Sequence, residues 1–127
     1  MSLSDSAVAV MLPTADASRA QEFYEGRLGL PHDGTNDAGE TLFRLAGGSQ
    51  LVLRTLPDAH PSPNTAMSFA VGDIAAEIAE LEARGVVFED YDQPGFTTVD
   101  HVFDDGSVKA AWFLDPDGNI LCLHQTG

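Results

Sequence analysis

Residues 16–29 read DASRAQEFYEGRLG and contain the start, the covering face and the stop of one helix. Asp16, or Thr14 before it, can cap the helix by accepting a backbone hydrogen bond. Gly29 can end it, because glycine readily takes the left-handed conformation that follows a helix. Side chains at three- and four-residue spacing form the covering face. They are Ala17, Ala20, Phe23, Tyr24, Arg27 and Leu28.

The same plan returns 57 residues later. Asp73 precedes the apolar residues Ile74, Ile78 and Leu81, and Gly85 stands at the end of the stretch. Cap, apolar face and stop follow one another in the same order and at nearly equal distances. We interpret this as an internal duplication in which each copy contributes one helix.

Short apolar or alternating runs around the two helices predict strands. The glycine pair in Ala46–Ser49 can supply the positive φ that a hairpin turn requires, and Asp115–Asn119 contains a proline and a glycine that favour a second reversal. Pro57–Asn64 holds three prolines and is expected to be a connector. The expected strands are Val8–Leu12, Glu40–Leu45, Gln50–Thr55, Ala66–Val71, Val86–Phe88, Lys109–Leu114 and Ile120–His124.

These elements predict a single α+β domain over residues 4–127, made of two βαβββ modules. The modules are expected at residues 7–56 and 65–125. Their strands would form a curved mixed sheet around a central cleft, with both helices outside. A small-molecule site is expected in that cleft, since ligand sites are concave.

Composition narrows the range of partners. The 127 residues include 20 acidic and 6 basic ones, a formal charge of −14, which repels nucleic acid and anionic lipid. With no long apolar run and no secretory signal, we expect a cytoplasmic protein with no membrane partner. The densest acidic stretch lies between Glu89 and Asp105, and it is either a solvated loop or a rim that attracts a cationic ligand. The lone Cys122 can form neither an internal disulfide nor a cysteine-built zinc site.

Three runs of sequence, residues 16–30, 69–86 and 112–119, together resemble the vicinal oxygen chelate superfamily. This is the group of glyoxalases, bleomycin-resistance proteins and extradiol dioxygenases. The runs stand in the order of that family and cover nearly the whole chain. The resemblance implies the paired βαβββ fold and a homodimer. It does not fix the chemistry, because the family spans metal-dependent lyases, isomerases and dioxygenases, thiol transferases and metal-free drug binders.

The resemblance also implies where metal-dependent relatives hold their ion. The corresponding positions here are Ala9, Val52, Ala66 and Cys122. Alanine and valine donate no electron pair, and a lone thiol does not hold a divalent ion against water. We therefore expect no metal and no other cofactor, and place the chain in a metal-free branch of the family.

Strand alternation and the resemblance together select the candidate ligand-binding residues. Trp112 offers a broad stacking face and one hydrogen-bond donor, with core packing as the alternative. His101 is either a ligand contact or a solvated loop histidine, and Cys122 is expected to be an inert buried thiol. On the strand before Gly47, either Phe43 or Arg44 faces the cleft. The candidate set is Met11, Ser68, Tyr91, Phe96, Thr98, His101, Trp112 and Cys122.

These features favour a non-catalytic protein that sequesters a cationic or aromatic metabolite or antibiotic. One alternative is a lyase or isomerase of the glyoxalase superfamily. It would use a non-standard metal site or acid-base residues, such as His101 with Asp100 or Asp104. A dimerisation module whose cleft is filled by its own side chains is a further alternative.

Overall fold

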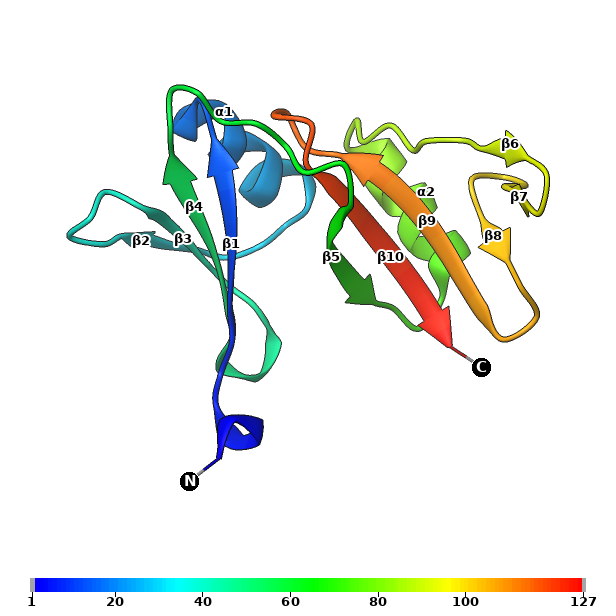
Figure 1. Ribbon diagram of the computed structural model, residues 1–127, viewed down its shortest axis with the longest axis horizontal. Helices are drawn as coiled ribbons and strands as arrows, with labels where there is room; N and C mark the ends of the chain where they lie inside the picture. The colour runs from blue at the N-terminus through cyan, green and yellow to red at the C-terminus, as the bar shows by residue number, and fades with distance from the viewer. Residues whose placement is uncertain (1, 127) are drawn as a thin grey trace. The chain divides into compact units, whose positions relative to one another are not determined.

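The computed structural model describes residues 2–126, which divide into two compact units, residues 2–60 and 61–126. The boundary falls inside the expected connector. Each unit contains one α-helix and one four-stranded mixed sheet (Figure 1). Gly127, the last residue of the expected domain, lies outside the described residues. Within residues 2–126, no helix is long and apolar enough to span a lipid bilayer.

The first unit contains the expected helix and strands, together with a strand at His32–Thr35 that the sequence did not predict. Its elements are η1 (Leu3–Asp5), β1 (Ala9–Thr14), α1 (Ala17–Gln21), the π-helix η2 (Glu22–Arg27), β2 (His32–Thr35), β3 (Thr41–Arg44), η3 (Ala46–Gly48) and β4 (Gln50–Thr55). The sheet has the order β1-β4-β3-β2, with β1 parallel to β4 and the other pairs antiparallel. The predicted cap is confirmed, because Asp16 Oδ1 accepts a hydrogen bond from the backbone N of Arg19 at 3.2 Å.

One face of this sheet packs on the helical segment. Phe43 is fully buried, and its ring centroid lies 5.8 Å from that of Tyr24 on η2. Phe43 therefore faces the helix, and Arg44 points to the opposite face of the sheet. The sequence alone had not decided between these two orientations. Gly47 and Gly48 have φ values of 70° and 79°, so the predicted positive-φ turn is confirmed.

The second unit repeats the connectivity of the first. Its elements are β5 (Thr65–Ala70), α2 (Ile74–Ala83), β6 (Asp92–Gln93), β7 (Phe96–Thr97), β8 (Phe103–Asp104), β9 (Val108–Leu114) and β10 (Ile120–Thr126). The main sheet has the order β5-β10-β9-β8, and β6 and β7 form a separate two-stranded ribbon. As in the first unit, the strand before the helix pairs in parallel with the last strand. The predicted α+β class is confirmed, and in both units a strand and a helix precede the remaining strands of the four-stranded sheet.

Contacts of α2 define the two faces of the second sheet. The backbone N of Ile74 donates to Gln125 Oε1 at 2.8 Å, so odd-numbered residues of β10 face this helix. Leu121, on that face, pairs with Phe113 of β9, and both are fully buried. Even-numbered residues of β9 and β10 therefore lie on the opposite face, away from α2.

The expected strand Val86–Phe88 is wrong. Only Phe88 forms a β-bridge, with Phe113 of β9. Further along the same edge of β9, Ala110 and Lys109 pair with β8 instead. Val86 and Phe88 are buried while Val87 is 79% exposed. The segment thus shows the alternating burial of a strand but has no continuous hydrogen-bonded partner.

Candidate functional site

Four aromatic side chains gather on the face of the second sheet that lies away from α2. Tyr91 stacks on Phe96 at a centroid distance of 5.0 Å. Trp112 meets both rings edge-on, at 5.7 Å from Tyr91 and 5.4 Å from Phe96. Phe103 packs against Phe96 at 4.8 Å. All four are only partly buried. We call Tyr91, Phe96, Phe103 and Trp112 the aromatic platform.

Polar side chains border the platform on the neighbouring strands. Cys122 pairs with Trp112 on one side and with Ser68 on the other, so the three side chains form one row across the sheet. Trp112 Nε1 donates to Thr65 Oγ1 at 3.2 Å. Ser68 Oγ lies 2.6 Å from His124 Nδ1. The face therefore combines a stacking surface with hydroxyl and imidazole groups.

Cys122 carries a protonated thiol. Burial raises the pKa of this thiol, and hydrogen bonds with Ser68 and Ala111 offset the effect only in part. A thiol that is buried and protonated is a poor nucleophile. We expect the native protein not to react with a disulfide reagent such as DTNB, and to release one equivalent of thiolate only when denaturant unfolds it. Rapid stoichiometric reaction of the native protein would contradict this expectation.

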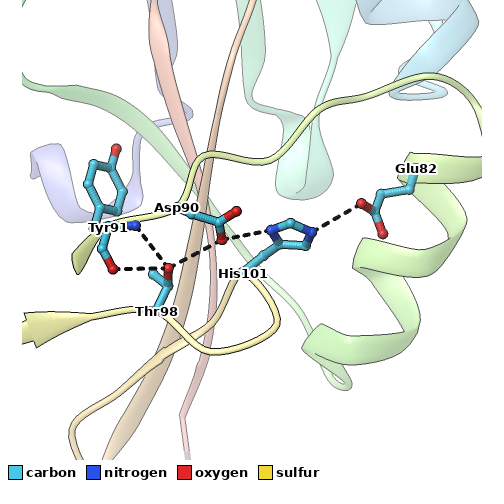
Figure 2. Close-up of polar contacts among 5 residues, drawn as sticks. All are labelled: Glu82, Asp90, Tyr91, Thr98 and His101. Atoms are coloured by element: carbon cyan, nitrogen blue, oxygen red, sulfur yellow. Dashed lines mark hydrogen bonds and ion pairs between the residues drawn. The ribbon is translucent and has the colours of Figure 1, made fainter.

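A chain of polar contacts crosses the second unit beside the platform (Figure 2). The imidazole of His101 lies between two carboxylates, with Nδ1 2.8 Å from Asp90 Oδ1 and Nε2 3.2 Å from Glu82 Oε2. The hydrogen bond with Asp90 is the main cause that raises the pKa of His101, the charges of Asp90 and Glu82 add to it, and partial burial opposes it. The arrangement favours an imidazolium that donates from both nitrogens.

Thr98 joins this chain to the aromatic platform. Its Oγ1 donates to Asp90 Oδ1 at 3.3 Å, and its backbone N donates to Tyr91 O at 2.8 Å. In return, the backbone N of Tyr91 donates to Thr98 Oγ1 at 2.9 Å. Figure 2 shows Tyr91 and Thr98 at one end of this series of polar contacts and Glu82, on α2, at the other end.

A groove of about 610 Å³ lies between α2 and the segment 97–104. Ile74, Ile78 and Val102 give it an apolar wall, while Glu82 and His101 border it as charged groups. It lies beside the helix and includes none of the platform residues.

The structure brings seven of the eight candidate residues together in the second unit. Tyr91, Phe96 and Trp112 meet in the platform, Ser68 and Cys122 share its sheet face, and Thr98 and His101 belong to the polar chain. The eighth, Met11, lies on β1 of the first unit and is 50% exposed.

Several contributors were not found by sequence reasoning. Phe103 completes the platform. The carboxylates that contact His101 are Asp90 and Glu82, and not Asp100 or Asp104, the partners that the sequence suggested. Asp100 and His101 form the reversal between Val99 and Val102, so the histidine ring turns back toward earlier segments. The only sequence signal of that reversal was the pair Val99 and Val102, two β-branched residues on either side of two polar ones.

The residues at the metal-ligand positions of the family do not fit a metal ion. Ala9, Val52 and Ala66 offer no donor atom, and the Cys122 thiol is buried. Among residues 2–126, no group of three or more His, Cys, Asp or Glu side chains is placed to hold an ion.

Comparison with known proteins agrees with the fold. No curated protein matches the chain significantly. Among solved structures, the antibiotic binding protein TnmS3 from Streptomyces sp. CB03234 is 25% identical, with a TM-score of 0.73 over 96% of each chain. A glyoxalase/bleomycin resistance protein from the same organism is 26% identical, with a TM-score of 0.69 over 94% of this chain and 100% of the other.

A third similar structure extends the likeness to another organism. A member of the glyoxalase/bleomycin resistance protein/dioxygenase superfamily from Sphaerobacter thermophilus DSM 20745 is 22% identical, with a TM-score of 0.72 over 94% of this chain and 96% of the other. The sequence profile of that superfamily matches residues 6–123, which is most of the chain. The chain therefore belongs to the glyoxalase/bleomycin resistance protein/dioxygenase superfamily.

Proposed function

We propose that this protein binds small aromatic molecules, cationic ones in particular, on the aromatic platform and without a metal ion. The observation that carries the proposal is the cluster of Tyr91, Phe96, Phe103 and Trp112, whose rings are in contact yet only partly buried. Aromatic rings with exposed surface stack on planar ligands and attract cations through their π faces. Sequestration of a metabolite or antibiotic is the corresponding biological role.

Two further features support this ligand class. The formal charge of −14 favours a cationic over an anionic ligand. TnmS3, whose fold this chain shares, is an antibiotic binding protein. Ala9, Val52 and Ala66 offer no donor atom at three of the family's metal positions, and the fourth holds only the buried Cys122 thiol, which supports binding that does not depend on a metal. A homodimer is part of the same proposal and rests on the family resemblance. The cytoplasmic location expected from the sequence is also part of it.

Isothermal titration calorimetry on EDTA-treated protein tests the proposal. The probes are proflavine as a planar aromatic cation, 2-naphthol as a neutral aromatic molecule and choline as a cation without a ring. We expect proflavine to bind more tightly than 2-naphthol, and choline to bind most weakly, because stacking and charge act together only in proflavine. Absence of heat with both aromatic probes, or binding that requires added Zn²⁺, Ni²⁺ or Mn²⁺, would overturn the proposal.

A second candidate is a lyase or isomerase that uses acid-base chemistry. The contact of 2.6 Å between Ser68 Oγ and His124 Nδ1, on the platform face, favours it, because a hydroxyl beside an imidazole is a common proton-transfer pair. His101 is a weaker candidate, since both of its nitrogens already face carboxylates. Turnover of a small oxo-acid or thioester that disappears in His124→Gln would favour this second function.

A further inference from the structure

Asp100 and His101 form a turn in which both residues have positive φ, a backbone conformation that is unfavourable for residues with side chains. Val99 and Val102 exchange two backbone hydrogen bonds, of 2.8 and 3.0 Å, so Asp100 and His101 alone form the loop. Their φ values are +52° and +71°. Two-residue loops with positive φ at both positions strongly favour Asn-Gly, so a histidine in the second position is costly. The His101 side chain must offset that cost through its contacts.

These contacts tie three separate segments together. His101 belongs to the turn, Glu82 to the last part of α2, and Asp90 to the segment that follows the Phe88 bridge. The ring also stacks on Phe88 at a centroid distance of 6.0 Å and an interplanar angle of 28°. Both nitrogens can donate to carboxylates only when the imidazole holds two protons.

The same contacts fix the base of the β6–β7 ribbon, which joins two rings of the platform. Asp90 precedes Tyr91 directly and accepts a hydrogen bond from Thr98, two residues after Phe96. The Tyr91 and Thr98 backbones are hydrogen bonded across the ribbon. A displacement of Asp90 would therefore move both Tyr91 and Phe96 relative to Trp112, which stands on β9.

We propose that His101, when protonated, latches the segment 90–101 to α2 and so positions the Tyr91–Phe96 pair against Trp112. His101 is thus a positioning residue for the aromatic platform. The consequence for ligand affinity rests on the proposed function, whereas the positioning of the rings does not.

The charged groups around His101 favour the protonated form. Asp90 and Glu82 face its two nitrogens, Asp100 precedes it in the turn, and Asp104 of β8 and Lys109 of β9 line the same groove. The hydrogen bond with Asp90 raises the pKa of His101 above the ordinary value of about 6.5. A raised folded-state pKa means that the latch is complete below about pH 6.5 and is lost as the pH rises through the folded-state pKa.

Fluorescence of Trp112, the single tryptophan, reports the position of the platform rings. Titrating the ligand-free protein from about pH 5.5 to pH 9 should give one transition in Trp112 emission, with its midpoint at the His101 pKa measured by NMR of the ring protons. His101→Gln should abolish the transition. Glu82→Gln should shift it to lower pH, because it removes one carboxylate from the imidazolium. His124→Gln, which changes the other histidine of the second unit, should leave the midpoint unchanged.

The outcomes separate this proposal from the proposed function. A flat Trp112 signal, or a transition that persists in His101→Gln, overturns the latch. A transition that depends on His101 supports it, even where neither proflavine nor 2-naphthol binds and the proposed function fails. If proflavine does bind, its Kd should rise about two- to fivefold across the same transition, since a partly exposed ion pair contributes little more.

Discussion

Trp112→Ala should weaken the binding of an aromatic ligand about 5- to 150-fold, the loss that corresponds to about 1–3 kcal/mol for one stacking side chain. Trp112 is in edge contact with Tyr91 and Phe96 of the platform and is only partly buried. Its removal deletes the largest ring surface and leaves its two neighbours without support. Calorimetric titration of proflavine into the wild type and the variant measures the change.

The control for this prediction is an aromatic residue on the other face of the same sheet. Phe69 pairs with Leu123, which faces α2, so Phe69→Ala should lower stability and leave the affinity of the folded protein within about twofold. Thr65→Val separates stacking from the indole hydrogen bond, because Thr65 accepts from Trp112 Nε1. Equal affinities of Trp112→Ala and the wild type would show that the platform does not bind the ligand.

Phe113→Ala should lower the free energy of unfolding by about 3–5 kcal/mol, the usual cost of deleting a large buried ring. Phe113 is fully buried on the α2 side of β9 and packs edge-on against Phe88 at 5.3 Å. The loss of the Phe113 ring leaves a cavity next to Phe88, just before the segment that leads to the platform residue Tyr91. Urea denaturation followed by circular dichroism should show a lower midpoint with an unchanged slope.

Val87→Ala provides a matched control beside Phe88. Val87 is 79% exposed, so its truncation should change stability by no more than about 0.5 kcal/mol. A loss below about 1 kcal/mol in Phe113→Ala would mean that this ring is not part of a tightly packed core.

Local sequence signals predicted most of the fold. Asp16 and Asp73 cap the two helices as expected, and the turn at Gly47 and Gly48 joins an antiparallel pair. The strand β2 was missed because His32–Thr35 contains no apolar alternation. The π-helical end of the first helix was missed because its residues have the spacing of an ordinary helix.

The site was predictable only in part, because its contacts join segments far apart in the sequence. The resemblance selected Tyr91 and Phe96, the stacking face of the indole selected Trp112, and strand alternation placed Ser68 and Cys122 on one face. The pairing of His101 with Glu82 was not predictable. It depends on where α2 ends relative to a turn that lacks the usual Asn-Gly sequence.

Mapping amide and aromatic chemical shifts during a proflavine titration locates the ligand-binding surface. We expect the largest shifts at Tyr91, Phe96, Phe103 and the Trp112 indole, on the sheet face away from α2. Shifts confined to the groove beside α2, at Ile78 and Val102, with none at Trp112, would contradict it.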